Sequence, residues 1–159
     1  MNNVYLLLGS NIGDSKAHLA TAKTNIENTL GQIIKASSIY KTDAWGNKNQ
    51  PAFLNQVIII ETALDPEQTI EEIFAIEEKM GRKRTVKNAP RIIDIDILFF
   101  NSEVIQTRNL TVPHSEIQNR HFVLFPMAEL SPDFTHPVLH KTMHCLLEDC
   151  IDTLNVQKI

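Results

Sequence analysis

The chain has 159 residues, of which 43% are hydrophobic, and it carries a formal net charge of −4. This length can bury one hydrophobic core but is too short for two ordinary domains, so we expect a single domain over residues 1–159. The negative charge provides no general attraction for nucleic acid or for an anionic membrane, which favours small-molecule partners.

Neither a membrane anchor nor a disulfide framework is indicated. The longest mostly apolar stretches, Val57–Ile60 and Ile95–Phe100, are far too short to cross a bilayer, and the first residues do not resemble a signal segment. The two cysteines, Cys145 and Cys150, fit neither a disulfide scaffold nor a zinc ribbon. We therefore expect a cytoplasmic protein with reduced cysteines.

The first part of the chain predicts a strand, a helix and two more strands. A strand over Val4–Leu8 is followed by a turn-rich run and then by a helix from about Ser15 to Leu30, which Gly31 ends. Residues Ile33–Thr42 and Phe53–Thr62 are rich in β-branched and aromatic types, which favours strands joined by a ten-residue polar loop.

A second helix is predicted by its start signals. Asp65 is a suitable N-cap, Pro66 suits the first helical position, and Gln68 completes a pattern that resembles a capping box. The helix is expected to end near Gly81.

The inner face of this helix carries an unexpected carboxylate. Ile70, Ile73 and Phe74 follow the i, i+3, i+4 pattern of a buried stripe, and the next position of that stripe is Glu77. Glu77 either reaches solvent at the edge of the stripe or faces a ligand at the end of the helix.

The clearest strand covers Ile93–Phe100. Beyond it, prolines interrupt the chain, and we expect a short helix near Val123–Leu130 and a terminal helix from about Lys141. The order βαββαβ predicts an α+β fold with a ferredoxin-like core, in which helices pack on one face of a four-stranded antiparallel sheet, and with a C-terminal extension.

Two carboxylates are paired within this strand. Because side chains alternate along a strand, Asp94 and Asp96 are expected to point the same way, while the isoleucines between and beside them point into the core. Such a pair can converge on two hard cations, which suits Mg²⁺. The alternative is an exposed sheet face on which water solvates both carboxylates.

The densest basic cluster of the chain lies just before the acidic pair. Guanidinium groups bind phosphate oxygens in a bidentate way, so a cationic cluster beside two carboxylates favours a polyphosphate ligand. The alternative is a solvated loop of surface charges. No Gly-rich phosphate-binding loop is present, so arginines and metal would have to hold the phosphates. The cluster comprises Arg82, Lys83, Arg84, Lys87 and Arg91.

The segment Lys87–Leu98 resembles the defining motif of the 6-hydroxymethyl-7,8-dihydropterin pyrophosphokinase family. Further segments resemble the family in its own order, so the similarity spans nearly the whole chain. The chain departs from the family pattern at Asn88, Ala89, Asn109 and Ser115. The further matching segments are Gly9–Asn11, Tyr40–Thr42, Gln50–Asn55, Leu110–His114 and Asn119–Phe122.

The resemblance implies a ferredoxin-like fold and a folate-biosynthesis reaction in which the pterin hydroxyl attacks the β-phosphorus of ATP and AMP is released. It implies that Asp94 and Asp96 hold two magnesium ions and that Arg82 and Arg91 stabilise charge on the transferred group. The residues that would line the ATP site are Glu77, Arg84, Ile97, Thr111, His114 and Arg120. Those that would contact the pterin are Thr42, Ala44, Trp45, Phe53, Asn55 and Phe122.

Simple chemistry agrees with these implied roles. A flat bicyclic ring is well held between aromatic faces such as Phe53 and Phe122, although spacing alone would equally suit two core residues. An amide such as Asn55 in an apolar strand needs hydrogen-bond partners, which a pterin edge can supply. His114 is either a phosphate donor or an ordinary loop histidine.

Two other functions remain open. A metal-dependent nucleotidyl transferase also mounts paired aspartates on such a sheet, but it has no use for a pocket of Phe53, Asn55 and Phe122. A noncatalytic small-molecule-binding module is the second. We expect a monomeric enzyme that binds neither nucleic acid nor membrane.

Overall fold

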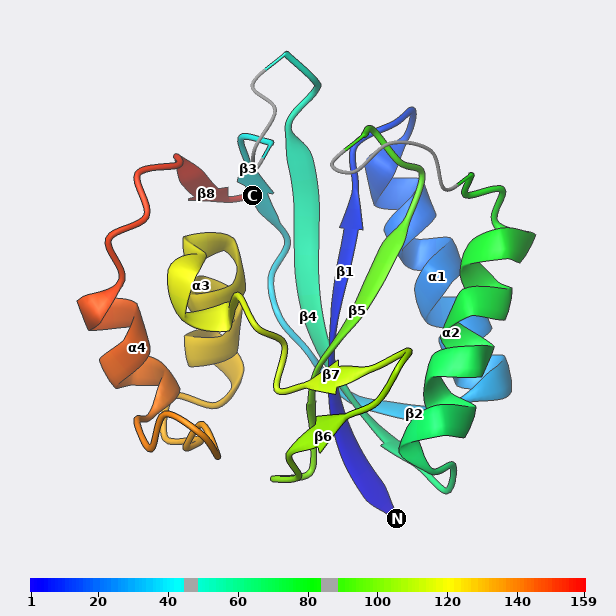
Figure 1. The fold of residues 1–159 in the computed structure, drawn as a ribbon. Coiled ribbons are helices and arrows are strands. Elements are labelled where there is room, and N and C mark those ends of the chain that lie inside the picture. The colour runs from blue at the N-terminus through cyan, green and yellow to red at the C-terminus, as the bar shows by residue number, and fades with distance from the viewer. Residues whose placement is uncertain (45–48, 84–88) are drawn as a thin grey trace.

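The computed structural model describes residues 1–44, 49–83 and 89–159. Eight strands and four α-helices alternate along these residues (Figure 1). In chain order they are β1 (Asn2–Ser10), α1 (Ser15–Thr29), β2 (Gly31–Ala36), β3 (Tyr40–Thr42), β4 (Phe53–Thr62), α2 (Pro66–Lys79), β5 (Asp94–Phe100), β6 (Ile105–Gln106), β7 (Thr111–Val112), a 3₁₀ turn (Ile117–Asn119), α3 (His121–Leu130), α4 (Met143–Asp149) and β8 (Val156–Lys158).

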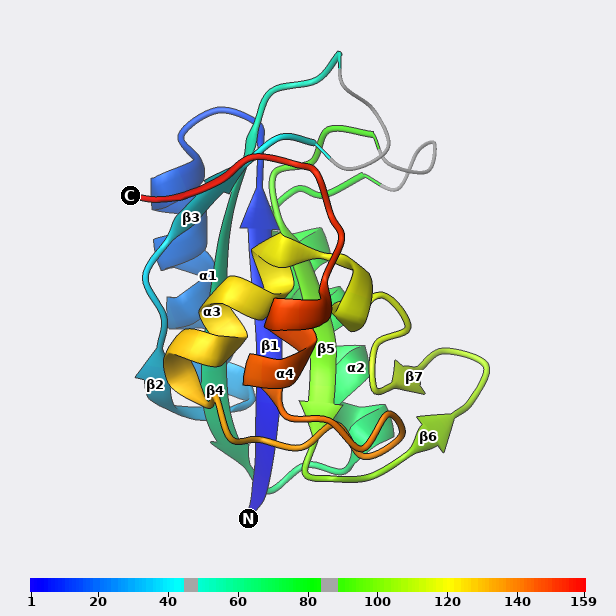
Figure 2. The same cartoon turned by 90° about the vertical axis from the view of Figure 1, so that its left-hand side faces the viewer.

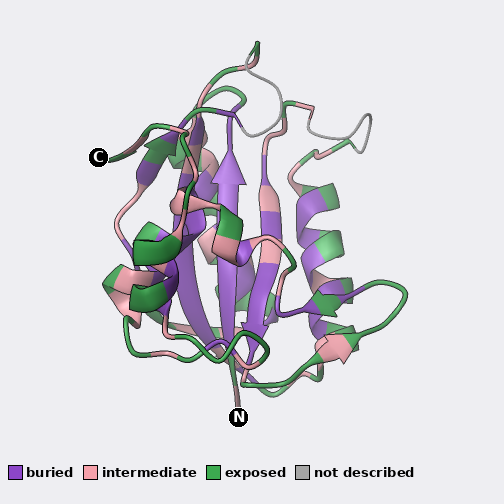
Figure 3. Ribbon diagram, turned by 60° about the vertical axis from the view of Figure 1, so that its left-hand side comes forward, coloured by how far each residue is buried: buried purple, intermediate pink, exposed green. Residues whose placement is uncertain are grey.

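Six strands form one sheet in the order β5-β1-β4-β3-β8, with β2 also paired to β4. Every pairing in this sheet is antiparallel. The central strands are buried along their length, as Figure 3 shows. β6 and β7 form a separate small hairpin.

The strand expected over Ile33–Thr42 is in fact two strands, β2 and β3. Ser37 separates them, and its hydroxyl accepts a hydrogen bond from the Val57 backbone N–H at 3.0 Å. The Gln56 side chain donates to the Ser37 carbonyl at 2.7 Å. At this point side-chain hydrogen bonds accompany a single backbone bond, from the Ser37 N–H to the Val57 carbonyl at 2.9 Å, and both strands still pair with β4.

Helices cover both faces of the sheet (Figures 1 and 2). α1 and α2 enclose one core with residues such as Leu6 and Ile58, and α3 and α4 enclose a second with Leu7 and Phe99. The two helices of the expected core lie on one face as predicted, but the sheet has six strands among the described residues instead of four, and the C-terminal helices α3 and α4 cover its second face. β1 is apolar at consecutive positions, so both of its faces require cover.

The start of α2 is confirmed in detail. The Asp65 carboxylate accepts from the Gln68 N–H at 2.8 Å, and the Gln68 side chain accepts from the Asp65 N–H at 3.0 Å. The predicted inner stripe was partly wrong, because Phe74 is 40% exposed and Ile76 is buried instead. Glu77 is only 2% exposed, so it does not reach solvent.

The region after β5 returns to the same end of the sheet as the acidic pair. α3 begins at His121 and α4 at Met143, each two residues from the expected start. The Asp152 carboxylate accepts a hydrogen bond from the first N–H of α3, that of His121, at 3.0 Å. β8, which the sequence did not predict, pairs with β3. Across the described residues, no helix has the length and apolar character needed to cross a bilayer.

Candidate active site

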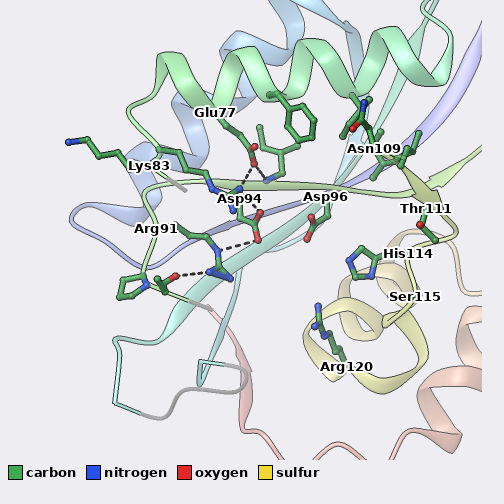
Figure 4. A pocket seen from close by; sticks show the side chains of 18 residues that line it. Glu77, Lys83, Arg91, Asp94, Asp96, Asn109, Thr111, His114, Ser115 and Arg120 are labelled. Carbon is green, nitrogen blue, oxygen red and sulfur yellow. Dashed lines mark hydrogen bonds and ion pairs between the residues drawn. The ribbon is translucent and has the colours of Figure 1, made fainter. Parts of the chain in front are cut away.

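Asp94 and Asp96 lie on one face of β5, as strand alternation predicts. Both are half-buried, whereas Ile93, Ile95 and Ile97 are fully buried on the opposite face. β5 pairs with β1, which places Asp94 opposite Gly9. Figure 4 shows the two carboxylates side by side above the cavity.

Asp94 belongs to a network of alternating charges. Arg82 Nη1 lies 2.6 Å from Glu77 Oε2 and 2.8 Å from Asp94 Oδ1. Arg91 Nε lies 3.3 Å from the other oxygen of Asp94. The Ile95 N–H also donates to Glu77 Oε2 at 2.9 Å. Glu77 therefore holds both an arginine and the β5 backbone in place.

Asp96 has a different electrostatic environment. Burial, followed by repulsion from Asp94 and Glu77, raises the pKa of Asp96 to about 8, and the nearby Arg120 and Arg82 only partly offset these effects. The ionised pair is thus unfavourable without additional positive charge. Two adjacent carboxylates match the donors that Mg²⁺ takes in sites where substrate phosphates and water complete its shell.

A cavity of about 540 Å³ opens in front of the acidic pair. Figure 4 shows Lys83 and Arg91 at one end, Asn109 and Thr111 at the other, and the aspartates between them. α2 provides one wall, including Phe74. The sequence-predicted residues that line it are Glu77, Arg82, Arg91, Asp94, Asp96, Ile97, Thr111, His114 and Arg120.

A smaller cavity of about 50 Å³ adjoins the first. Its walls include two aromatic rings, Phe53 and Phe122, each only 8% exposed. Thr42 and Asn55 also line it. Both cavities are lined by the same four charged residues, so they meet at the acidic pair. These shared residues are Arg91, Asp94, Asp96 and Arg120.

Each aromatic wall of the small cavity has an arginine over it. Arg91 Cζ lies 4.9 Å from the centroid of Phe53, and Arg120 Cζ lies 5.5 Å from the centroid of Phe122. Such contacts orient a guanidinium while leaving donors for another group. Both arginines therefore touch the wall of one cavity and line the other.

Asn55 is the polar centre of the small cavity. It is 3% exposed, and its Nδ2 has no hydrogen-bond partner among the residues that the structure describes. Gly9 pairs with it across the sheet, and a Cβ atom at Gly9 would lie 2.8 Å from Asn55 Oδ1. The absence of a side chain at Gly9 therefore makes room for this amide.

His114 is oriented as a neutral donor. Its Nδ1 accepts a hydrogen bond from the Glu116 N–H at 3.1 Å, which leaves the proton of a neutral ring on Nε2. Burial, followed by the positive charge of Arg120, lowers the pKa of His114 despite the carboxylates of Asp94 and Glu116. At neutral pH it can donate one hydrogen bond to an anionic oxygen.

One sequence-predicted residue that the structure describes lines neither cavity, and two others are not among the described residues. Ala44 is buried and lines neither of them, while Trp45 and Arg84 lie outside the described residues. The sequence placed Lys83 in the basic cluster but gave it no role of its own, and it treated Asn109 and Ser115 only as departures, although all three line the larger cavity. The sequence feature that could have indicated their place in the cavity is that each lies between segments that match the family.

Comparisons with known proteins agree on one family. The family described as 7,8-dihydro-6-hydroxymethylpterin-pyrophosphokinase (HPPK) matches residues 5–132. A relative named 2-amino-4-hydroxy-6-hydroxymethyldihydropteridine pyrophosphokinase from Aquifex aeolicus is 41% identical over 90% of this chain and 89% of its own length. One of the same name from Bacillus subtilis is 44% identical over 82% of this chain and 79% of its own length.

Longer proteins contain the same unit. A Schizosaccharomyces pombe protein named folic acid synthesis protein fol1 is 38% identical over 98% of this chain, which spans 21% of that protein. The crystal structure of a Plasmodium falciparum HPPK-DHPS triple mutant has the same fold, with a TM-score of 0.77, 20% identity, and coverage of 93% of this chain and 43% of that one. Given the family match over residues 5–132 and these identities, the chain belongs to the 7,8-dihydro-6-hydroxymethylpterin-pyrophosphokinase family.

Proposed function

We propose that the chain transfers diphosphate from ATP to the hydroxymethyl group of 6-hydroxymethyl-7,8-dihydropterin in folate biosynthesis. One observation carries this function: a large charged cavity and a small aromatic cavity share Arg91, Asp94, Asp96 and Arg120. A triphosphate in the first and a flat ring in the second would meet at the shared residues. The pterin oxygen bonds to the β-phosphorus, the bond from that phosphorus to the bridging α,β-oxygen breaks, and AMP leaves.

The charged cavity is the ATP site in this proposal. Arg82 and Arg91 are held by Asp94, so their remaining donors are oriented before the phosphates arrive. His114 donates from Nε2 to a phosphate oxygen. Glu77 acts indirectly, because its carboxylate accepts hydrogen bonds from Arg82 and from the Ile95 N–H and so keeps both in position. Thr111, Ile97 and Arg120 complete the walls, and Arg84 is proposed to join them.

Asp94 and Asp96 would hold two Mg²⁺ ions. The fit rests on the paired carboxylates and on the raised pKa of Asp96, which reflects negative charge that a cation would offset. When bound, Mg²⁺ neutralises charge on the phosphates during transfer. The chain itself excludes water, orients the arginines and aligns the two substrates.

The small cavity is the pterin site in this proposal. Phe53 and Phe122 would enclose the ring, and the Asn55 amide would donate to an acceptor on the pterin edge. Thr42 lines this cavity. Ala44 and Trp45 remain proposed contacts of the pterin. A buried donor of this kind gives strong discrimination, because a ligand without an acceptor leaves it unsatisfied.

Gly9→Ala is expected to weaken pterin binding at least tenfold and to leave ATP binding within about twofold. The added methyl would lie 2.8 Å from Asn55 Oδ1, so the ligand-facing amide must move, whereas its 3.7 Å distance from Phe53 Cδ1 is an ordinary contact. Calorimetric titration with each substrate alone measures the two affinities. Equal losses for both substrates would contradict a role confined to the pterin cavity.

Three further features belong to the proposal. We assign a ferredoxin-like core, supported by the order β5-β1-β4 followed by β2 and β3 and by the antiparallel pairings. We also propose that the protein is a monomer. The cytoplasm, where ATP and Mg²⁺ are available, is the proposed location.

The decisive experiment incubates the protein with ATP, MgCl₂ and 6-hydroxymethyl-7,8-dihydropterin and separates the products. AMP and diphosphorylated pterin in equal amounts are expected. Release of pyrophosphate with AMP attached to an acceptor would instead indicate a nucleotidyl transferase. Binding of both ligands without AMP formation would indicate a noncatalytic module. Chelation of the metal by EDTA is expected to stop turnover.

A further inference from the structure

Asn11 is the buried centre of a hydrogen-bond cluster at the end of β1. It is 4% exposed, and its Nδ2 donates to Gln50 Oε1 at 2.7 Å and to the Pro51 carbonyl at 3.1 Å. Its Oδ1 accepts from the Arg91 N–H at 2.9 Å. Its own backbone N–H donates to the Arg91 carbonyl at 3.1 Å. One residue thus joins three segments that are far apart in sequence.

The orientation of this amide is fixed by backbone chemistry. The Pro51 carbonyl can only accept and the Arg91 N–H can only donate, so Oδ1 and Nδ2 cannot exchange places. Only an amide side chain of this length serves both partners. An aspartate would keep the acceptor but lose both donor bonds, and a leucine would lose all three side-chain hydrogen bonds.

The two segments that Asn11 joins carry groups from the two proposed substrate sites. Phe53, a wall of the small cavity, follows Pro51 by two residues. Arg91 reaches back over the Phe53 ring, with Cζ 4.9 Å from the centroid, and its Nε lies 3.3 Å from Asp94. The contact between Phe53 and Arg91 therefore depends on two backbone segments that the Asn11 amide holds at a fixed separation.

We infer that Asn11 is a positioning residue that couples binding at the pterin site to binding at the ATP site. The inference rests on the proposed function of the two cavities. A pterin between the aromatic walls restricts the motion of Phe53. Because Asn11 joins the backbone next to Phe53 to that of Arg91, Arg91 is then also held in position beside Asp94. The second substrate then binds to a site that is already ordered, so the two affinities reinforce each other.

Asn11→Asp is the most informative variant, because it retains the acceptor for the Arg91 N–H and removes both donors to Gln50 and Pro51. Asn101→Asp is its matched control. Asn101 lies at the opposite end of the sheet, where its Nδ2 donates to Asn2 Oδ1 at 3.0 Å and to Glu103 Oε2 at 3.1 Å. It makes the same chemical change and also removes two donor bonds, away from both cavities.

The test measures pterin affinity by calorimetry with and without α,β-methylene-ATP and MgCl₂, because this analogue blocks the bond that is broken. The wild-type protein is expected to bind pterin at least tenfold more tightly with the analogue. Asn11→Asp is expected to reduce this enhancement about tenfold, whereas Asn101→Asp preserves it even where both variants unfold at the same temperature.

The possible outcomes distinguish failure of the proposed function from failure of the inference about Asn11. A wild-type protein that forms no AMP with both substrates would overturn the proposed function. An active wild-type protein with no enhancement, or an Asn11→Asp variant with the wild-type enhancement, would overturn the inference alone. Loss of the enhancement in both asparagine variants would also overturn it, because general destabilisation would then explain the result.

Discussion

Asp96→Asn is expected to reduce diphosphate transfer by about 10³-fold while raising the melting temperature of the metal-free protein. Activity falls because one of the two carboxylates proposed to hold Mg²⁺ loses its charge. Stability rises because the ionised Asp96 is disfavoured by burial and by repulsion from Asp94 and Glu77. An amide of the same shape removes this penalty.

The gain in stability depends on pH in a defined direction. The pKa of Asp96 is raised to about 8 in the folded chain from an ordinary value of 3.8, so the folded state binds the extra proton between these values. The wild-type protein therefore loses stability as pH rises through this window, and an asparagine does not. The difference in melting temperature should be larger at pH 8 than at pH 5.

Thermal unfolding in EDTA at both pH values and turnover at saturating substrates check this prediction. Asp149→Asn is a suitable control, because Asp149 forms an exposed ion pair with Lys141 at 3.0 Å. It should change stability by less than about 1 kcal/mol and leave turnover unaltered. Wild-type activity in Asp96→Asn would reject the metal-binding role, and a lower melting temperature would reject the electrostatic account.

Arg82→Ala is expected to lower both stability and turnover, by about 3 kcal/mol and at least 10²-fold respectively. Arg82 Nη1 contacts Glu77 and Asp94, and the Glu77 side chain is only 3% exposed. Removal of the guanidinium deletes the ion pair that Arg82 makes with the buried Glu77 carboxylate, which lies close to the aspartates. Chemical denaturation and steady-state kinetics measure the two losses.

A double variant separates these two effects. Glu77→Gln added to Arg82→Ala removes the buried negative charge and leaves an amide oxygen that can still accept from the Ile95 N–H. Most of the stability should return, whereas turnover should stay low because the phosphates still lack Arg82. Recovery of turnover together with stability would show that Arg82 acts only as a structural partner of Glu77.

Strictly local patterns allowed the acidic pair and the start of α2 to be predicted. Strand alternation alone places Asp94 and Asp96 on one face, and the capping residues of α2 lie within four positions of one another. Glu77 was also visible as a break in an apolar stripe, although the sequence left open whether it reaches solvent or faces a ligand. Each of these features depends on neighbours along the chain.

Features that depend on distant contacts could not be predicted. The break between β2 and β3 arises from Ser37 bonds to residues about twenty positions away. The space that Gly9 leaves for Asn55 follows from the register between β1 and β4, which the sequence does not specify. Phe74 faces the large cavity instead of the core, because Ile76 occupies the inner side of α2.

The family match ends at residue 132, yet residues beyond it form hydrogen bonds to two segments that line the small cavity. Asp152 bonds to the His121 N–H next to Phe122, and the Thr42 hydroxyl donates to the Asn155 carbonyl at 3.1 Å. A fused tag or module that displaced residues 150–158 would therefore weaken binding of the pterin before it affected diphosphate transfer. A fusion at this end of the chain would need a flexible spacer to preserve selectivity.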